Sequence, residues 1–465
     1  MNKEMLRLAL PSIFANLTVP LVGMVDMSVA GHLDTSAAAL IGGVSVGSLM
    51  FDLLYWNFGF LRAGTGGMTA QAFGRKDREG CAANLTLGVG LALVIALALI
   101  LVQWPFQKLF FLFVGCSDEV RSLALDYFRI RIWAAPATLS LMAFRGWFIG
   151  MQDTFSSMLT DLVVNCGNIL FSIFLTFGIQ GIGLPGIGFK GIAVGTVVAQ
   201  YIGLLLASAV ALLKFGSVLR PESSMSVGLK AAFGGGRIRR FFSVNRDLFV
   251  RSVCLIVVYL AFTSISAGFG DTLLAICSIM LKLLLVFSYF TDGFAFAGEA
   301  LTGKYVGSRN PGMVGRTVGY TFAWSMGIGV FFVGIYALFG VPMIRLLTSD
   351  TSVVEASRNF IPWLVFFPLI SCPAFTWDGI YTGATATKAM RDSNIGCVIA
   401  FFTVWCAGKY LLPVSRSVTA GAHLLFASYY AHLIFRSLYQ TIFYRRSIIA
   451  PLGSAFTEIL ADDRK

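Results

Sequence analysis

Long apolar runs separated by short polar breaks dominate this chain of 465 residues. A helix that crosses a membrane needs roughly 20 mostly apolar residues. The runs of this length are 7–29, 40–61, 82–104, 121–143, 156–179, 191–213, 245–268, 272–297, 317–340, 354–377, 394–412 and 418–440. They lack the polar–apolar alternation that a membrane barrel requires. The pattern therefore predicts an all-α integral membrane protein with twelve transmembrane helices.

Composition supports the same class of protein. Hydrophobic residues make up 57% of the chain and charged residues 12%, whereas soluble domains carry about 25% charged residues. Lys3 and Arg7 precede an apolar run that is long enough to span, and no small-residue cleavage site follows it. The first helix is therefore expected to stay in the mature protein.

The basic residues are unevenly distributed between the two sides of the predicted spans. Lys and Arg number 24 on the side that holds the N-terminus and 7 on the opposite side, and four lie inside spans. Cytoplasmic loops are enriched in Lys and Arg, so both termini are predicted to be cytoplasmic. The net charge of +12 is then explained by topology and anionic lipid, and no nucleic-acid partner is expected.

The two halves of the chain resemble each other. Thr69–Gly74 matches Thr302–Gly307 at an offset of 233, and Gly146, Gly150 and Thr154 match Gly379, Gly383 and Thr387 at the same offset. The segment Gly59–Gly64 matches Gly293–Gly298 one residue out of step. An even number of spans in each half makes this a parallel repeat, in which the substrate path lies near the membrane midplane. The predicted organisation is an N-terminal six-helix lobe 1–213, a cytoplasmic linker 214–244, a C-terminal six-helix lobe 245–441 and a cytoplasmic tail 442–465.

An acidic residue lies near the outer end of the first span. An ionisable side chain within a span costs at least about 2.5–3.5 kcal/mol, so Asp26 requires an explanation. Pro11 and Pro20 lie in the same helix and favour bends, because proline lacks a backbone donor. Asp26 is either an ion-coupling acid on a bent helix or a boundary residue that caps the turn at Gly31. The first interpretation is favoured.

A polar stripe follows the fifth span. Its members are spaced by four, three, four and four residues and share one helical face: Asp161, Asn165, Asn168, Ser172 and Thr176. Such a stripe faces either another helix or a wet cavity. Thr196 in the sixth span and Asp52 in the second add polar groups to the same half of the chain. This convergence favours a substrate cavity formed by Asn165, Asn168, Ser172, Thr196 and Asp52.

The second half offers further candidates. Lys282 lies in the middle of the eighth span, Asp292 and Glu299 lie seven residues apart on one helical face, and Asp378 lies at the inner end of the tenth span. They form either a second functional site or a structural ion pair. The three histidines fit no metal motif, and no phosphate-binding Gly-rich run occurs. We therefore expect an ion gradient as the energy source, with H⁺ or Na⁺ as the coupling ion and no other cofactor or metal.

Several segments carry a resemblance to a known family. The first span, with Leu8–Pro11, Asn16, Val25-Asp26 and Ala30–Leu33, resembles the first helix of MATE (multidrug and toxic compound extrusion) transporters. Phe58–Thr65 with Thr69–Gly74, Asp292–Leu301, and Asp378–Thr385 with Met390-Arg391 are similar to the DinF-like branch of that family. The resemblance covers essentially the whole chain.

The resemblance implies two six-helix bundles around a central cleft. It also implies that the chain is no enzyme but an antiporter, which exports organic, often cationic and amphipathic compounds by alternating access. Asp26 would be the coupling acid, with Asn168 and Thr196 beside it. Family members usually carry an Asp where this chain has Ser172. Proton coupling is preferred, because one carboxylate among neutral oxygens titrates readily.

The same resemblance places the chain as a multi-pass monomer in the bacterial inner membrane, with membrane lipid and a small organic substrate as its partners. A lipid-linked precursor flippase of the same superfamily is the first alternative, although Lys282 is the lone lysine in the middle of a span. An integral-membrane transferase is the second, and the three scattered histidines argue against it.

Overall fold

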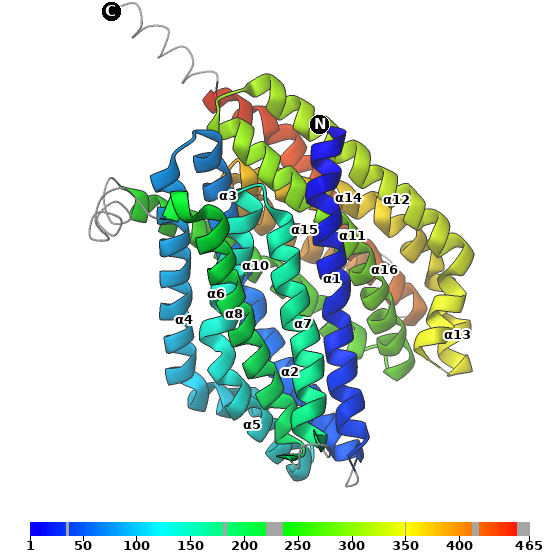
Figure 1. The fold of residues 1–465 in the computed structure, drawn as a ribbon. Helices are drawn as coiled ribbons and strands as arrows, with labels where there is room; N and C mark the ends of the chain where they lie inside the picture. Colours follow the sequence, from blue (N-terminus) through cyan, green and yellow to red (C-terminus); the bar gives the residue numbers. More distant parts are fainter. Residues whose placement is uncertain (34–36, 180–183, 220–235, 349, 412–417, 453–465) are drawn as a thin grey trace, which may run out of the picture. The chain divides into compact units, whose positions relative to one another are not determined.

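The computed structural model describes the chain except for residues 34–36, 180–183, 220–235, 349, 412–417 and 453–465. Parts of the predicted linker and tail thus lie outside the described residues. The first half contains α1 (Asn2–Gly31), α2 (Ala37–Trp56), α3 (Phe60–Gly74), α4 (Arg78–Phe113), α5 (Asp118–Arg131), α6 (Ala135–Gly150), α7 (Thr154–Phe177) and α8 (Lys190–Leu219), with short strands β1 (Gly178–Ile179) and β2 (Leu184–Pro185) between the last two helices (Figure 1). The second half contains α10 (Arg237–Ala267), α11 (Asp271–Gly307), α12 (Pro311–Leu347), α13 (Thr351–Ser357), α14 (Ile361–Gly383), α15 (Thr387–Leu411) and α16 (Val418–Tyr444), which continues into a π-helix at Arg445–Ile449.

The helices confirm the predicted all-α membrane class. Within the described residues, 11 helical stretches are long and apolar enough to cross a membrane. The remaining predicted span, 121–143, falls in α5 and α6, which a 3-10 turn at Ile132–Ala134 separates. Pro136 lies in the first turn of α6. Proline is common in the first turn of a helix, because backbone N–H groups there have no acceptor within the helix and the missing donor is not needed. By contrast, α1 continues through both Pro11 and Pro20.

The backbone repeats the duplication seen in the sequence. Outside glycine, positive φ angles among the described residues occur at Lys76 (60°), Gln152 (64°), Arg309 (53°) and Thr385 (50°). These form two pairs at the offset of 233. The helices that follow the turns at Lys76 and Arg309 are also capped alike. Asp77 accepts a hydrogen bond from the Gly80 N–H at 2.7 Å, and Asn310 accepts one from the Met313 N–H at 3.0 Å. The two halves therefore fold their turns in the same way.

Glycines allow close helix contacts at matched positions. A Cβ atom at Gly146 would lie 2.0 Å from the carbonyl oxygen of Arg62, and one at Gly379 would lie 2.1 Å from that of Ala295. The partners Arg62 and Ala295 are also 233 residues apart. The helix contacts therefore keep the offset of 233 in this segment. The sequence match of Gly59–Gly64 with Gly293–Gly298 differs from this offset by one residue.

Residue contacts divide the chain into two compact units. We call Phe14–Phe242 the first unit, and Met1–Ile13 together with Ser243–Lys465 the second unit. The helix α1 contributes its first residues to the second unit, where Ala9 and Ile13 lie against Gly293 of α11. Its remaining residues, including Asp26, belong to the first unit. The predicted lobes began at residue 1 and at residue 245, so the start of α1 groups differently from that division.

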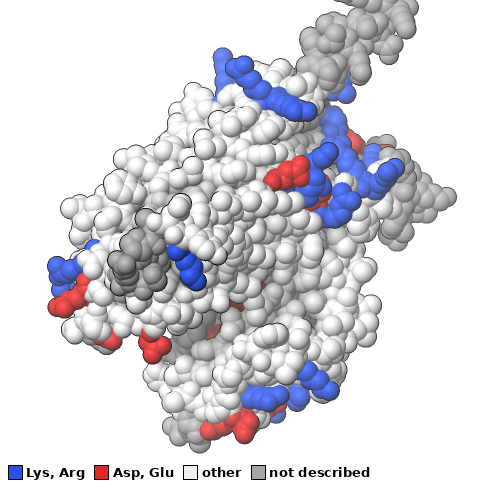
Figure 2. All heavy atoms as spheres, turned by 180° about the vertical axis from the view of Figure 1, so that it is seen from behind, with Lys and Arg blue, Asp and Glu red and all other residues white. Residues whose placement is uncertain are grey.

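Charged side chains are sparse on the surface. On the face that Figure 2 shows, Lys and Arg gather in separate groups, and broad areas between these groups carry no charge. Many large apolar side chains are exposed on the long helices, among them Leu101, Leu213 and Leu338. Such surfaces are stable in contact with lipid rather than with water.

Candidate functional site

The polar stripe of α7 meets α1 and α8 in the first unit, and its members Asn168, Ser172 and Thr176 are buried. The Asn168 amide donates a hydrogen bond to the Thr196 hydroxyl of α8 at 2.7 Å. The Ser172 hydroxyl lies 3.3 Å from Oδ1 of Asp26 and 3.3 Å from the carbonyl oxygen of Ile192. The structure thus brings Asp26, Asn168, Ser172 and Thr196 together, although α1 is far from α7 and α8 in the sequence.

Small residues allow this arrangement. A Cβ atom at Gly195 of α8 would lie 2.5 Å from the backbone nitrogen of Ser172, and one at Gly191 would lie 2.5 Å from that of Thr176. The two helices therefore pack backbone to backbone, and Figure 1 shows α7 beside α8. The short polar side chains of α7 can then reach across to neighbouring helices.

Asp26 is the buried acid of this cluster, with 4% of its surface exposed. Its side chain interacts electrostatically with Arg131 at the end of α5. Arg131 donates a hydrogen bond to the Tyr127 hydroxyl at 2.9 Å and stacks over the ring of Phe51, 4.8 Å from its centroid. Asp52 of α2 also interacts with Arg131. The guanidinium of Arg131 therefore interacts with two carboxylates.

Arg131 and Tyr127 were not selected as site residues from the sequence. The available signal was that Arg131 is an ionisable residue within a predicted span. Two predicted cavity residues have other surroundings. Asp52 is exposed on α2, and the Asn165 amide donates a hydrogen bond to the Thr18 hydroxyl of α1 at 2.6 Å. Asn165 thus ties α7 to α1.

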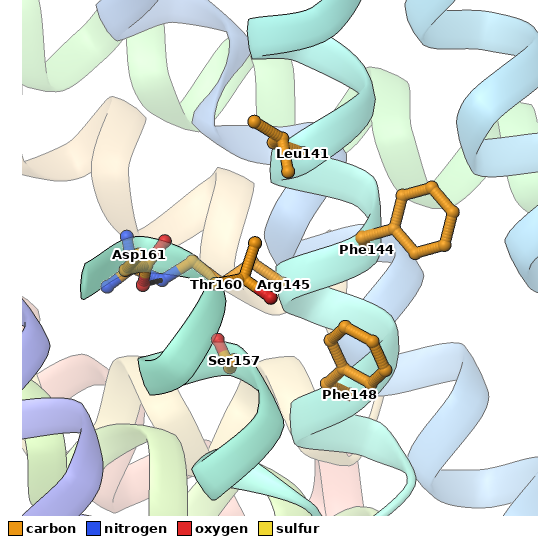
Figure 3. Close-up of a pocket in the computed structure, with 7 residues that line it drawn as sticks. All are labelled: Leu141, Phe144, Arg145, Phe148, Ser157, Thr160 and Asp161. Atoms are coloured by element: carbon orange, nitrogen blue, oxygen red, sulfur yellow. Dashed lines mark ion pairs between the residues drawn. The ribbon is translucent and has the colours of Figure 1, made fainter. Parts of the chain in front are cut away.

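A second polar group lies nearer the α6–α7 turn, at the end of the unit predicted to be cytoplasmic. Arg145 of α6 lies 3.2 Å from Asp161 of α7 and donates a hydrogen bond to Asn16 of α1 at 2.7 Å. Arg145 and Asp161 line a shallow crevice, in which they point toward each other (Figure 3) and which has no enclosed room for even a water molecule. Ligand pockets for small molecules have volumes of about 300–1,000 Å³. The crevice is therefore too small to be the substrate cavity.

The duplication shows that the polar cluster belongs to the first unit alone. At the offset of 233, Asn168 and Ser172 correspond to Phe401 and Trp405, and Tyr127 and Arg131 correspond to Phe360 and Leu364. Phe360, Leu364 and Phe401 are buried in the apolar core of the second unit. Most of the equivalent place is therefore apolar, although Thr196 corresponds to Tyr429. The buried acid with its amide and hydroxyl partners is thus not a requirement of the shared fold.

The candidates of the second unit have different partners. Asp378 of α14 forms ion pairs with Arg251 of α10 and Arg436 of α16. Lys282 is exposed, and the structure gives it no acidic partner among the residues it describes. Asp292 is half-buried and Glu299 is buried on α11. Because two arginines already form ion pairs with Asp378, this acid is a poor ligand for a cation.

The sequence profile of the MatE family matches residues 11–177 and 248–411. The chain is 32% identical over 421 residues to DNA damage-inducible protein F of Escherichia coli (strain K12), covering 90% of this chain and 89% of that protein. It is 25% identical to the probable multidrug resistance protein NorM of Thermotoga maritima, covering 87% and 84%.

Solved structures share the fold. A crystal structure of MATE in the bent conformation superposes with a TM-score of 0.81 at 17% identity, covering 97% of this chain and 96% of that chain. A MOP superfamily transporter from Pyrococcus furiosus superposes with a TM-score of 0.76 at 17% identity, with the same coverage of 97% and 96%.

Proposed function

The chain belongs to the MatE family of multi-pass membrane transporters, and from that premise we propose that it is a proton-coupled antiporter that exports organic cations. Relatives named as multidrug resistance proteins support export of organic compounds. The proposal places the protein in the bacterial inner membrane with both termini in the cytoplasm, in agreement with the distribution of Lys and Arg.

The observation that carries the proposal is the buried carboxylate of Asp26. It is 4% exposed and accepts a hydrogen bond from Ser172, in a polar cluster for which the duplicated half has mostly apolar residues. Ionisable groups inside a membrane bundle are costly and mark ion pathways. The second unit keeps the fold without such a cluster, so the cluster supports a function that the fold does not require.

The surroundings of Asp26 favour a proton over sodium. Hard cations bind several oxygen ligands at once, whereas a proton needs one. The hydrogen-bond partner of Asp26 is the Ser172 hydroxyl, and the Arg131 guanidinium is a second neighbour that supplies no oxygen. Within the described residues, no group of three or more His, Cys, Asp or Glu could hold a metal ion.

Charge also supports a cationic substrate. Asp26 and Asp52 both interact with Arg131, so two negative charges face one positive charge. Asp52 is exposed, whereas the ring of Phe51 is buried beneath the Arg131 guanidinium. An exposed carboxylate in this unit is suited to attract an organic cation.

The cycle follows from the partners of Asp26. When Asp26 is charged, Ser172 and Arg131 hold α1 in one packing. Protonation removes the charge, so that Arg131 remains with Asp52 alone and α1 repacks. Proton and substrate can exchange only if the protein binds the organic cation with different affinity in the two packings of α1. In the proposed cycle, the packing with protonated Asp26 has the lower affinity for the organic cation, which is then released outward.

The test is transport by the purified protein in sealed liposomes. Uptake of a fluorescent organic cation would be followed with a pH gradient alone and then with a sodium gradient alone. We expect uphill movement with the pH gradient only, and dissipation of that gradient by the substrate. Uphill movement with sodium alone would overturn proton coupling, and no movement with either gradient would overturn cation antiport.

A further inference from the structure

The second unit holds a cluster of charged side chains at the predicted cytoplasmic ends of α10, α14 and α16. Asp378 contacts Arg251, and its Oδ2 lies 3.7 Å from Nη1 of Arg436. The Gln440 amide donates a hydrogen bond to Oδ1 of Asp378 at 3.4 Å. Within the described residues, these two arginines form ion pairs with Asp378 alone. Two positive charges therefore face one negative charge.

Arg436 carries the uncompensated part of this charge. It is 2% exposed, and its Nε and Nη2 atoms have no hydrogen-bond acceptor in the part of the chain that the structure describes. Its guanidinium lies over the ring of Phe375, 5.5 Å from the centroid. An arginine has five N–H donors and cannot lose its charge by deprotonation. A neutral partner could satisfy the donors, but only an anion also balances the charge.

Two other acids near this end of the unit, Asp247 and Asp392, are paired elsewhere. Asp247 lies 2.9 Å from Arg391 and 3.4 Å from Arg246. Asp392 lies 2.7 Å from Arg391. These four side chains carry two positive and two negative charges, so this neighbouring group is balanced. It supplies no spare carboxylate to Arg436.

The duplication supplies an internal comparison. Asp378 corresponds to Arg145 at the offset of 233, so the sign of the charge is reversed at this position. In the first unit, Arg145 meets the carboxylate of Asp161 and the amide of Asn16. The second unit has an acid there with two arginines around it. The excess positive charge is therefore a property of the second unit and not of the shared scaffold.

We propose that Arg436, together with Arg251, forms a binding site for a monovalent anion in the second unit. The ligand is either chloride or the carboxylate group of a small organic molecule, both of which accept hydrogen bonds from a guanidinium. The site goes beyond the proposed antiport, because the coupling acid lies in the first unit. Bound anion neutralises the cluster and links α10, α14 and α16.

The test measures thermal unfolding of the purified full-length protein in detergent micelles. Sodium chloride would replace sodium methanesulfonate at constant ionic strength, and sodium acetate would replace it in a second series. We expect a saturable rise of the unfolding midpoint of about 2–4 °C. A response to chloride alone identifies an inorganic ion as ligand. Competition between acetate and chloride identifies a carboxylate as an equal ligand, and no response to either anion overturns the proposal.

Two variants and a control make the result specific. Arg436→Gln should abolish the anion response. Asp378→Asn removes the competing carboxylate, so half-saturation should need at least about tenfold less anion, as expected for a change of one charge pair. Arg446→Gln, at an exposed position, should behave like the wild type. An unchanged half-saturation in Asp378→Asn would overturn the site even if Arg436→Gln did not fold. No gradient is involved, so this result is independent of proton coupling.

Discussion

Replacing Asp26 by asparagine removes the charge of the coupling acid while keeping its size and its ability to accept a hydrogen bond from Ser172. Because the carboxylate is buried and makes that bond at 3.3 Å, the variant mimics the protonated form. We expect a folded protein whose α1 stays in one packing. Substrate should still bind, but binding should no longer depend on pH, because linkage requires a group that titrates.

The magnitude follows from the number of carboxylates in the cluster. Asp26 is the buried acid that accepts a hydrogen bond from the polar stripe, whereas Asp161 is paired with Arg145 and Asp52 is exposed. One proton should therefore be exchanged per cycle. Each pH unit then drives about a tenfold concentration ratio of a monovalent cation, because one unit corresponds to about 1.4 kcal/mol. A gradient of about two units should sustain a ratio of up to about 100 in the wild type. The Asp26→Asn ratio should stay near one.

The assay is substrate accumulation in liposomes, with the membrane potential clamped at zero. Asp126→Asn is the matched control, because Asp126 is a partly exposed acid of α5 that lies 3.8 Å from Lys190. It should accumulate substrate like the wild type. Accumulation by Asp26→Asn with unchanged pH dependence would refute the role of Asp26. A ratio near one for both variants would show that loss of any acid impairs the protein, which also refutes it.

Three further predictions concern the stripe, the packing and the topology. Asn168→Leu should give a folded protein in which gradient-driven accumulation falls at least about tenfold; normal accumulation would show that the stripe only holds helices together. Gly146→Val should lower stability by at least about 1–3 kcal/mol in denaturant titrations, because its Cβ would lie 2.0 Å from the Arg62 carbonyl oxygen; a stable variant would contradict this contact. In a background without other accessible cysteines, a cysteine at the exposed position Ser308 should be labelled by an impermeant reagent only after lysis. A cysteine at the exposed position Ser117 should be labelled in intact cells. The reverse pattern would contradict the predicted orientation.

The membrane fold could be predicted from the sequence because apolar runs and repeated motifs are local patterns. Hydrophobic length alone located the helices, and glycines at one offset revealed the duplication. The break in the fourth span was not predicted. It depends on Pro136 lying in the first turn of a new helix, and a proline within an apolar run is also compatible with a continuous helix, as α1 shows.

The site could be predicted only in part. The spacing of the α7 stripe placed its members on one helical face, but spacing within one helix does not reveal its partners. The sequence therefore did not indicate that Arg131 interacts with Asp26, or that Arg251 and Arg436 surround Asp378. These contacts join helices that are far apart in the chain. An unpaired ionisable residue within a span was the available signal, and it identifies a charge without its partner.

The glycine contacts determine which helices of the first unit can move separately. Where Gly146 meets the Arg62 carbonyl and Gly195 meets the Ser172 backbone, no side chain separates the helices, so α3 with α6 and α7 with α8 should each behave as a rigid pair. By contrast, a Cβ atom at Gly23 of α1 would have no neighbouring atom within 4 Å. In this unit, α1 is tied to α7 by side-chain hydrogen bonds from Asn165 and Ser172. Such bonds can break singly without separating packed backbones, so α1 can slide or rotate while the rigid pairs keep their shape.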